Sequence, residues 1–267
     1  MNSFQIFVLA VVQGVTEFLP ISSSGHLLLV PLLTGWQDQG LAIDIATHIG
    51  TLLAVLLYFK SDLIYMIQAM LGKGSATDII GGRQLTFHLI VGSLPALLAG
   101  GAIYFIAEVD LRSLLMIAMT TLFFGVVLGI ADHFFKGTRD LRSMNSWDAL
   151  FIGIFQIFAL FPGTSRSGVT MTAALIRGLD RVAAARFSML LSIPIIAAAG
   201  IAATIKTSMT QDFIFDFNAL IAGAIAFIVA YLVIKILMRW INKVGFMPFV
   251  IYRMILGVFL LGLYVTN

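Results

Sequence analysis

The sequence predicts an all-α polytopic membrane protein, and three observations support this prediction. Of its 267 residues, 60% are hydrophobic and only 11% are charged, whereas soluble domains carry about 25% charged residues. Apolar runs of about 20 residues, the length that crosses a bilayer as a helix, recur along the chain. Two further apolar segments are interrupted by proline, glycine and serine. The expected fold is six transmembrane helices plus two re-entrant helix hairpins, in a single membrane domain over residues 1–267.

The six long apolar runs are expected to be helices, because backbone exposed to lipid must satisfy its hydrogen bonds within its own segment. The segments 4–33 and 148–177 differ, since each consists of two short apolar stretches around a break. Such broken pairs are typical of re-entrant hairpins. Eight ordinary spans without re-entry are the alternative interpretation. The expected spans are roughly 41–59, 87–106, 113–135, 184–205, 217–237 and 247–265.

The basic residues predict the orientation in the membrane. With six spans and two re-entrant hairpins, four clusters of Lys and Arg all fall on one face, which is expected to be cytoplasmic. Both termini then lie outside, and the two hairpins enter from opposite faces. Residues 1–135 and 148–267 are therefore predicted to form an inverted-topology repeat. The clusters are Lys60, Lys73 and Arg83; Lys136, Arg139 and Arg142; Arg177, Arg181 and Arg186; and Lys235, Arg239 and Lys243.

Several classes of chemistry are excluded or unsupported. The chain has no cysteine, which excludes disulfides, thiolate metal sites and a cysteine nucleophile. It has no Walker loop and no HExxH motif, so nucleotide binding and classical zinc chemistry have no support. The net charge of +3 reflects membrane topology rather than nucleic-acid binding. Residues 1–4 lack a basic region, so no cleaved signal peptide is expected.

The two interrupted segments carry related polar sequences. Residues 13–26 read QGVTEFLPISSSGH, and residues 156–169 read QIFALFPGTSRSGV, with 5 of 14 positions identical at an offset of 143. Pro20 and Pro162 cannot continue the preceding helix, and serine is a favoured N-cap for the next one. The cap candidates are Ser22, Ser23 and Ser24 in the first break and Thr164, Ser165 and Ser167 in the second.

A phosphate or diphosphate site is expected where the two breaks meet. The free N–H groups and positive dipole ends of two helix starts favour an anion, and Arg166 adds a fixed charge with a bidentate fork. Gln13 and Glu17 share a helix face at i and i+4. His26 follows the serines on the same face of the new helix. Polar groups at membrane depth are costly unless they function or are paired.

Structural interpretations exist for the same residues. Serines in membrane helices often satisfy local backbone or hold helices together. Glu17 could be protonated and hydrogen-bonded, and Arg166 could be its structural partner. Asp44 and His48, at i and i+4 in the first full span, could line the same cavity or hydrogen-bond each other.

These motifs resemble those of the undecaprenyl-diphosphate phosphatases, also called bacitracin-resistance proteins. The resemblance rests on residues 13–26, on PGTSRSG at 162–168 and on GFMPFVIYR at 245–253, and it covers essentially the whole chain. It implies a multi-pass enzyme of the bacterial inner membrane that hydrolyses undecaprenyl diphosphate, a polyprenyl diphosphate lipid. Recycling of this carrier for peptidoglycan synthesis, bacitracin resistance and a site open to the periplasmic face are implied as well. Dependence on a divalent cation, Mg²⁺ or Ca²⁺, also comes with the resemblance.

The resemblance further implies catalytic roles for Glu17, His26, Arg166 and the serine cluster, from which Ser23 is selected as a catalytic residue. Ser23 is the expected nucleophile, with His26 or Glu17 accepting its proton, and attack by water activated by Glu17 or the metal is the competing mechanism. Because Gln13 offers only a neutral carbonyl, a metal is expected to bridge Glu17 and the diphosphate oxygens. The remaining expected substrate-binding residues are Gln13, Ser22, Ser24, Asp44, His48, Thr164, Ser165, Ser167 and Thr170.

Two other classes of function compete with the phosphatase. Inverted repeats with broken helices at the midplane are the architecture of secondary transporters, so a transporter or flippase of an anionic lipid or ion is the main alternative. A scaffold protein without a site leaves the two polar clusters unexplained. The sequence leaves the oligomeric state open, a homodimer included.

Overall fold

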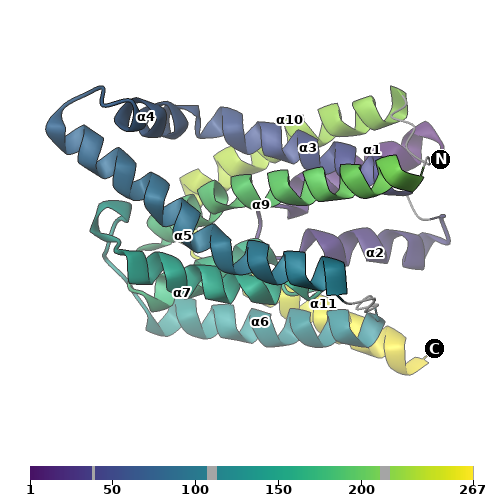
Figure 1. The fold of residues 1–267 in the computed structure, drawn as a ribbon. Helices are drawn as coiled ribbons and strands as arrows, with labels where there is room; N and C mark the ends of the chain where they lie inside the picture. Colours follow the sequence, from purple (N-terminus) through teal and green to yellow (C-terminus); the bar gives the residue numbers. More distant parts are fainter. Residues whose placement is uncertain (38–39, 107–112, 211–216, 267) are drawn as a thin grey trace.

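The computed structural model describes residues 1–37, 40–106, 113–210 and 217–266, and within these ranges it is all-helical, with no strand. The helices pack side by side in one bundle (Figure 1). The α-helices are α1 (Ser3–Thr16), α2 (Ser23–Thr34), α3 (Gly40–Tyr58), α4 (Lys60–Met70), α5 (Ala76–Ile106), α6 (Leu114–Phe134), α7 (Ser146–Gln156), α8 (Arg166–Ile176), α9 (Arg181–Thr210), α10 (Phe217–Val244) and α11 (Met247–Thr266). Two 3₁₀ turns, η1 (Leu141–Ser143) and η2 (Ile157–Leu160), flank α7.

Within the described ranges, six helices are long and apolar enough to cross a membrane: α3, α5, α6, α9, α10 and α11. The prediction of six spans is therefore confirmed. Two helices extend beyond the predicted runs, since α5 begins at Ala76 and α10 continues to Val244. Helix α4 lies outside the predicted elements. Hydropathy marks the part of a helix that suits lipid, and it does not mark where the helix itself begins or ends.

Both interrupted segments are pairs of short helices. Helices α1 and α2 have 14 and 12 residues, and α7 and α8 have 11 each. Each is too short to span a bilayer alone, because about 20 residues are needed. The alternative of eight ordinary spans is thus not supported. That each pair enters and leaves by one face stays a prediction, with which the short helices are compatible.

The basic clusters lie at one end of the bundle. Both chain termini are at the opposite end from α4 and the α6–α7 connection (Figure 1). Ion pairs join the clusters, since Arg186 pairs with Asp62 near α4, and Arg139 and Arg177 share Asp148. This arrangement agrees with the predicted topology.

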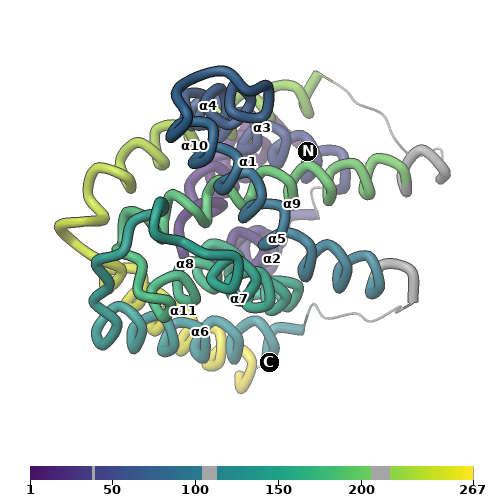
Figure 2. The backbone as a smooth tube through the Cα atoms, turned by 60° about the vertical axis from the view of Figure 1, so that its left-hand side comes forward, coloured from purple at the N-terminus to yellow at the C-terminus, as the bar shows by residue number. Residues whose placement is uncertain are grey.

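Three of the short helices lie in the middle of the bundle. Helices α2, α7 and α8 lie between α3 and α10 on one side and α6 and α11 on the other (Figure 2). The two halves also exchange contacts, because α1 packs on α10 and α7 packs on α5. Glycines permit these approaches. A Cβ on Gly153 would lie 2.5 Å from the carbonyl oxygen of Gly92, and one on Gly14 would lie 2.9 Å from that of Ala226. The reciprocal packing is compatible with the inverted repeat, which stays a prediction.

Candidate functional site: a polar cluster at two helix breaks

The two breaks have the same unusual backbone. Ser22 has φ 73° and ψ 98°, and Ser165 has φ 71° and ψ 110°. They are the two described non-glycine residues with positive φ. Each caps its helix, since Ser22 Oγ accepts from the Gly25 N–H (3.4 Å) and Ser165 Oγ from the Gly168 N–H (3.1 Å). The predicted cap serines are thus confirmed at these two positions. Left-handed conformations of this kind cost about 1–3 kcal/mol and are concentrated at functional sites.

The likeness of the two breaks extends to their other polar groups. Gln13 and Gln156 occupy equivalent positions, and the side-chain carbonyl oxygen of each is buried without a hydrogen-bond partner. A second hydroxyl lies beside the cap serine in each break. These hydroxyl pairs are Ser22 with Ser24 (3.3 Å) and Ser165 with Ser167 (3.1 Å).

Glu17, at the end of α1, is the centre of the polar cluster. Its Oε1 accepts from Arg166 Nη2 (3.3 Å). Its Oε2 accepts from Ser23 Oγ (2.8 Å) and Gln13 Nε2 (2.9 Å). His48 Nε2 lies 3.9 Å from the same oxygen. The structure therefore brings the acid of the first break to the arginine of the second, and the expected shared face of Gln13 and Glu17 is confirmed.

Arg166 is held from three sides. Besides Glu17, its Nη1 donates to the Ser188 carbonyl of α9 (3.2 Å), and its guanidinium lies 5.9 Å from the centre of the Phe18 ring. Only 11% of its side chain is exposed. The ion pair between Glu17 and Arg166, which was the structural interpretation of these residues, is present. It lies within the polar cluster.

Arg253 of α11 joins both breaks and was missed from the sequence. It is completely buried, and no carboxylate of the described residues forms an ion pair with it. All the hydrogen bonds seen for it go to backbone carbonyls, so no acid in the described part of the chain compensates its charge. An arginine inside a predicted membrane span indicates a functional or paired residue, so Arg253 could have been identified from the sequence on that basis. The acceptors are Pro20 (3.2 Å), Thr164 (2.9 Å), Gly163 (3.2 Å), Thr120 (3.3 Å) and Thr121 (3.1 Å).

The other predicted residues lie around this cluster in different settings. His48 Nδ1 bonds to the backbone carbonyl of Asp44 (2.8 Å), which orients the ring toward Glu17. Thr170 is completely buried and bonds to Ser188 Oγ (2.6 Å), so it ties α8 to α9. The hydroxyl of Thr164 is buried without a partner. Ser24 is exposed.

The described side chains do not form a complete metal site by themselves. No group of three or more His, Asp or Glu that could hold an ion occurs among them. Both oxygens of Glu17 already accept hydrogen bonds. The unpartnered Gln13 Oε1 is nevertheless a hard oxygen beside a carboxylate. This pair fits a Mg²⁺ or Ca²⁺ ion that takes its other ligands from phosphate and water.

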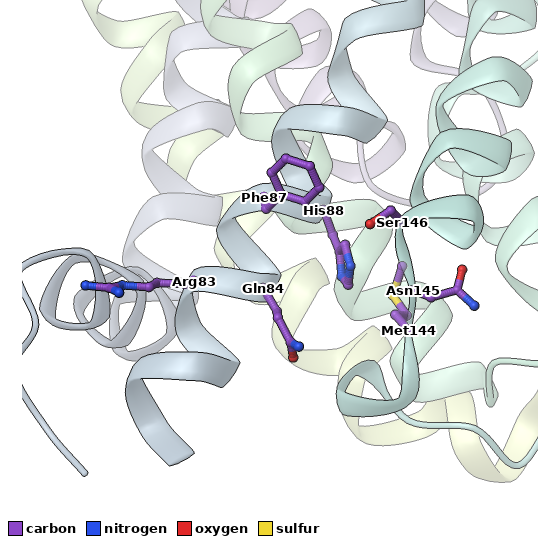
Figure 3. A pocket seen from close by; sticks show the side chains of 7 residues that line it. All are labelled: Arg83, Gln84, Phe87, His88, Met144, Asn145 and Ser146. Atoms are coloured by element: carbon purple, nitrogen blue, oxygen red, sulfur yellow. The ribbon is translucent and has the colours of Figure 1, made fainter. Parts of the chain in front are cut away.

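Two cavities lie at the basic end and are separate from this cluster. One, of about 390 Å³, opens between α5 and the start of α7 (Figure 3). The other, of about 560 Å³, shares Gln84 and His88 with it. Neither is lined by a residue of the polar cluster. The first is lined by Arg83, Gln84, Phe87, His88, Met144, Asn145 and Ser146.

A carboxylate, a hydroxyl and an arginine meet at two helix breaks inside a bundle with six apolar helices of membrane-spanning length, which defines a polytopic membrane protein with an internal polar cluster. Comparison with known proteins makes this class more specific. The family Bacitracin resistance protein BacA matches residues 6–259, and the chain belongs to it.

Curated relatives cover nearly the whole chain. The Undecaprenyl-diphosphatase of Alteromonas mediterranea is 47% identical over 262 residues, which are 98% of each chain. That of Hahella chejuensis is 49% identical over 263 residues, again 98% of each. That of Marinobacter nauticus is 47% identical over 258 residues, covering 96% of this chain and 97% of its own.

Proposed function

We propose that this protein is an undecaprenyl-diphosphatase, a multi-pass membrane hydrolase. It converts undecaprenyl diphosphate to undecaprenyl phosphate and inorganic phosphate, which recycles the lipid carrier for peptidoglycan synthesis and gives bacitracin resistance. Family membership and the names of full-length relatives support this activity. The six apolar helices support a multi-pass membrane protein, and a location in the bacterial inner membrane is consistent with the family.

The observation that carries the proposal is the contact of Ser23, Glu17 and Arg166. A hydroxyl donates to a buried carboxylate at 2.8 Å, and a guanidinium lies on the other oxygen of that carboxylate at 3.3 Å. A nucleophile hydrogen-bonded to a base is the arrangement that activates a hydroxyl. Arginine beside it is suited to phosphate oxygens. The two helix starts supply further N–H donors.

In the first step, Ser23 Oγ attacks the terminal phosphorus while its proton passes to Glu17 Oε2. The new Oγ–P bond forms as the bond from phosphorus to the bridging oxygen breaks, and undecaprenyl phosphate leaves. Arg166 stabilises the phosphoryl oxygens in the transition state. The Glu17–Arg166 pair is then a resting contact, since the incoming diphosphate competes for the guanidinium and frees the carboxylate to act as a base.

In the second step, water attacks the phosphoserine, the Oγ–P bond breaks, inorganic phosphate leaves with both protons of the water, and Ser23 is regenerated. Glu17 returns its proton to the serine oxygen. The surplus charge of buried Arg253 favours an anion at the breaks in both steps. A divalent cation held by Glu17 and Gln13 would neutralise part of the phosphate charge.

Every group assigned a role comes from the same molecule, so a homodimer would not need to contribute a residue to the site. The polyprenyl tail needs no polar partner and is expected to lie against the apolar helices. We place the opening of the site on the periplasmic side, as the family resemblance implies.

Release of inorganic phosphate tests the proposed activity. Purified protein in detergent, supplied with undecaprenyl diphosphate and Mg²⁺, is expected to release one phosphate per lipid. Undecaprenyl monophosphate should release none and serves as the control. A folded protein that binds the diphosphate lipid without releasing phosphate would instead be the transporter that the architecture also allows.

Trapping of a phosphoenzyme tests the serine mechanism. Substrate labelled at the terminal phosphate, quenched in acid, is expected to leave label on Ser23, and Ser23→Ala should lose both the label and turnover. Ser24→Ala is the matched control, because its neighbouring hydroxyl does not contact Glu17. Substantial turnover by Ser23→Ala would contradict the serine mechanism and favour direct attack by water.

A further inference from the structure

Tyr252 of α11 contacts a site residue that the proposed chemistry leaves without an assigned step. Its hydroxyl lies 2.5 Å from His26 Nε2. The two rings are stacked, with centroids 5.6 Å apart and planes at 10°. His26 is on the first turn of α2, at the first break, 226 residues away in sequence. The two ring planes are thus nearly parallel, and the tyrosine hydroxyl meets the edge of the imidazole at Nε2.

The second ring nitrogen of His26 fixes the direction of this hydrogen bond. His26 Nδ1 lies 2.7 Å from the carbonyl oxygen of Ser22. A carbonyl can only accept, so Nδ1 must carry a proton. In the neutral imidazole Nε2 is then the acceptor, and the Tyr252 hydroxyl donates to it. The cap residue of α2 and a residue of α11 together hold the ring in one tautomer and one plane.

The same contacts separate His26 from the nucleophile. Ser23 donates to Glu17 (2.8 Å), whereas both nitrogens of His26 are engaged elsewhere. Any proton that His26 takes up must arrive at Nε2, where the Tyr252 hydroxyl lies. Tyr252 is 41% exposed and His26 is half-buried, so Tyr252 is the more exposed member of the pair.

We propose that Tyr252 is a positioning residue for the phosphatase reaction, acting through His26: it holds the imidazole with Nε2 as its proton-accepting atom at the first break. This inference rests on the proposed function. Tyr252 itself makes no contact with Ser23, Glu17 or Arg166 among the hydrogen bonds of the described residues. Its effect on catalysis should therefore depend entirely on the presence of His26.

The test is a double-mutant cycle of Tyr252→Phe and His26→Gln. Tyr252→Phe keeps the stacked ring and removes only the hydroxyl. We expect kcat for phosphate release to fall about tenfold with KM nearly unchanged, below the roughly 10²–10⁴-fold that a positioned acid or base itself contributes. Added to His26→Gln, the tyrosine change should cost nothing further, because residues that act as a unit are not additive. Tyr264→Phe, also on α11 and 48% exposed, is the control and should leave kcat unchanged.

A nitrogen NMR spectrum of the histidines gives a readout that needs no activity. The chain has four histidines, so His26→Gln assigns the His26 signals. Tyr252→Phe should shift the His26 Nε2 resonance, and Tyr264→Phe should not. An unshifted resonance, an unchanged kcat or additive losses in the double mutant would each overturn the proposal. A shifted resonance in a folded protein that releases no phosphate would show instead that the proposed function is wrong.

Discussion

Two buried arginines meet the same helix breaks and have different partners. Arg166 bonds to the carboxylate of Glu17 and to the Ser188 carbonyl, whereas every bond of Arg253 goes to backbone carbonyls. The first arrangement can exchange its anion for a phosphate. The second fixes the backbone that presents the N–H groups. Substitutions should separate these two functions.

At Arg166 the geometry of the side chain should matter as much as its charge. Arg166→Lys keeps the charge but cannot reach both Glu17 and the Ser188 carbonyl with a planar fork. We expect it to lower kcat/KM by about 10²–10³-fold, the usual effect of removing a fixed transition-state donor, and nearly as much as Arg166→Ala. Phosphate-release kinetics of the two variants provide the measurement. Near-normal activity of the lysine variant would show that charge alone suffices.

We expect Arg253 to be required for the stability of the folded protein, and for activity as a consequence. Arg253→Met removes the donor from the Pro20 and Thr164 carbonyls, for which no other donor is seen among the described residues, and each unpaired buried carbonyl costs about 1–3 kcal/mol. We expect a lower melting temperature in detergent, together with lost activity. Arg239→Met, an exposed change on α10, is the control and should melt like the wild type. A normally melting Arg253→Met protein would refute the role of Arg253 in holding the breaks.

At the scale of the helix, each break depends on a serine with a left-handed backbone. Ser22→Gly suits the φ of 73° and should cost only a few tenths of a kcal/mol. Ser22→Ala keeps the strain and loses the cap, so we expect it to be about 1 kcal/mol less stable than the glycine variant. Thermal melting compares them, with the same pair at Ser165 as an internal replicate. Equal stabilities of the alanine and glycine variants would argue against the strained cap.

Local signals explain which elements were predictable. Proline followed by serine predicts the end of one helix and the N-cap of the next, so both breaks could be inferred from the sequence. The contact between Glu17 and Arg166 could be inferred as well, because each residue lies beside one of the two breaks. Arg253 and Tyr252 reach the breaks from α11. Arg253 bonds to backbone carbonyls and Tyr252 bonds to one nitrogen of His26, and contacts of this kind produce no recognisable spacing of residue types in the sequence. Helix α4 and the early start of α5 were missed because hydropathy reports lipid contact rather than helix length.

For the molecule as a whole, Asp148 joins the connections at the basic end. Its side chain is completely buried and accepts from Arg139 Nη2 and Arg177 Nε, both at 2.6 Å, as well as from the Asn145 N–H. Burial alone would raise the pKa of Asp148, but the hydrogen bonds from Arg139, the Asn145 backbone and Arg177 hold that pKa below its ordinary value. The ionised form therefore stabilises the fold.

The pH dependence of stability follows from this lowered pKa. A carboxyl whose pKa is depressed on folding contributes stability above its unfolded pKa of about 4, and that contribution is lost as the pH falls through the folded pKa. Asp148→Asn should lower the unfolding free energy by about 2 kcal/mol near neutral pH, less than the about 3–5 kcal/mol for a fully buried pair because the arginines are partly exposed. The difference from wild type should shrink below about pH 4.

Melting of wild type and Asp148→Asn across this pH range is the measurement. Asp140→Asn, an exposed change on the same connection, is the control and should differ from wild type by less than about 1 kcal/mol. A wild-type advantage that persists unchanged at low pH would exclude the ionised Asp148 as its source.

One measurement tests the central claim that both breaks build a single phosphatase site. Phosphate release from undecaprenyl diphosphate is measured for folded wild type, Glu17→Gln from the first break, Arg166→Ala from the second, and the double variant. We predict rapid release by wild type, near-background release by either single variant, and no further loss in the double variant, because parts of one catalytic unit are not additive. Absence of release by folded wild type, or substantial release by either single variant, would contradict the account.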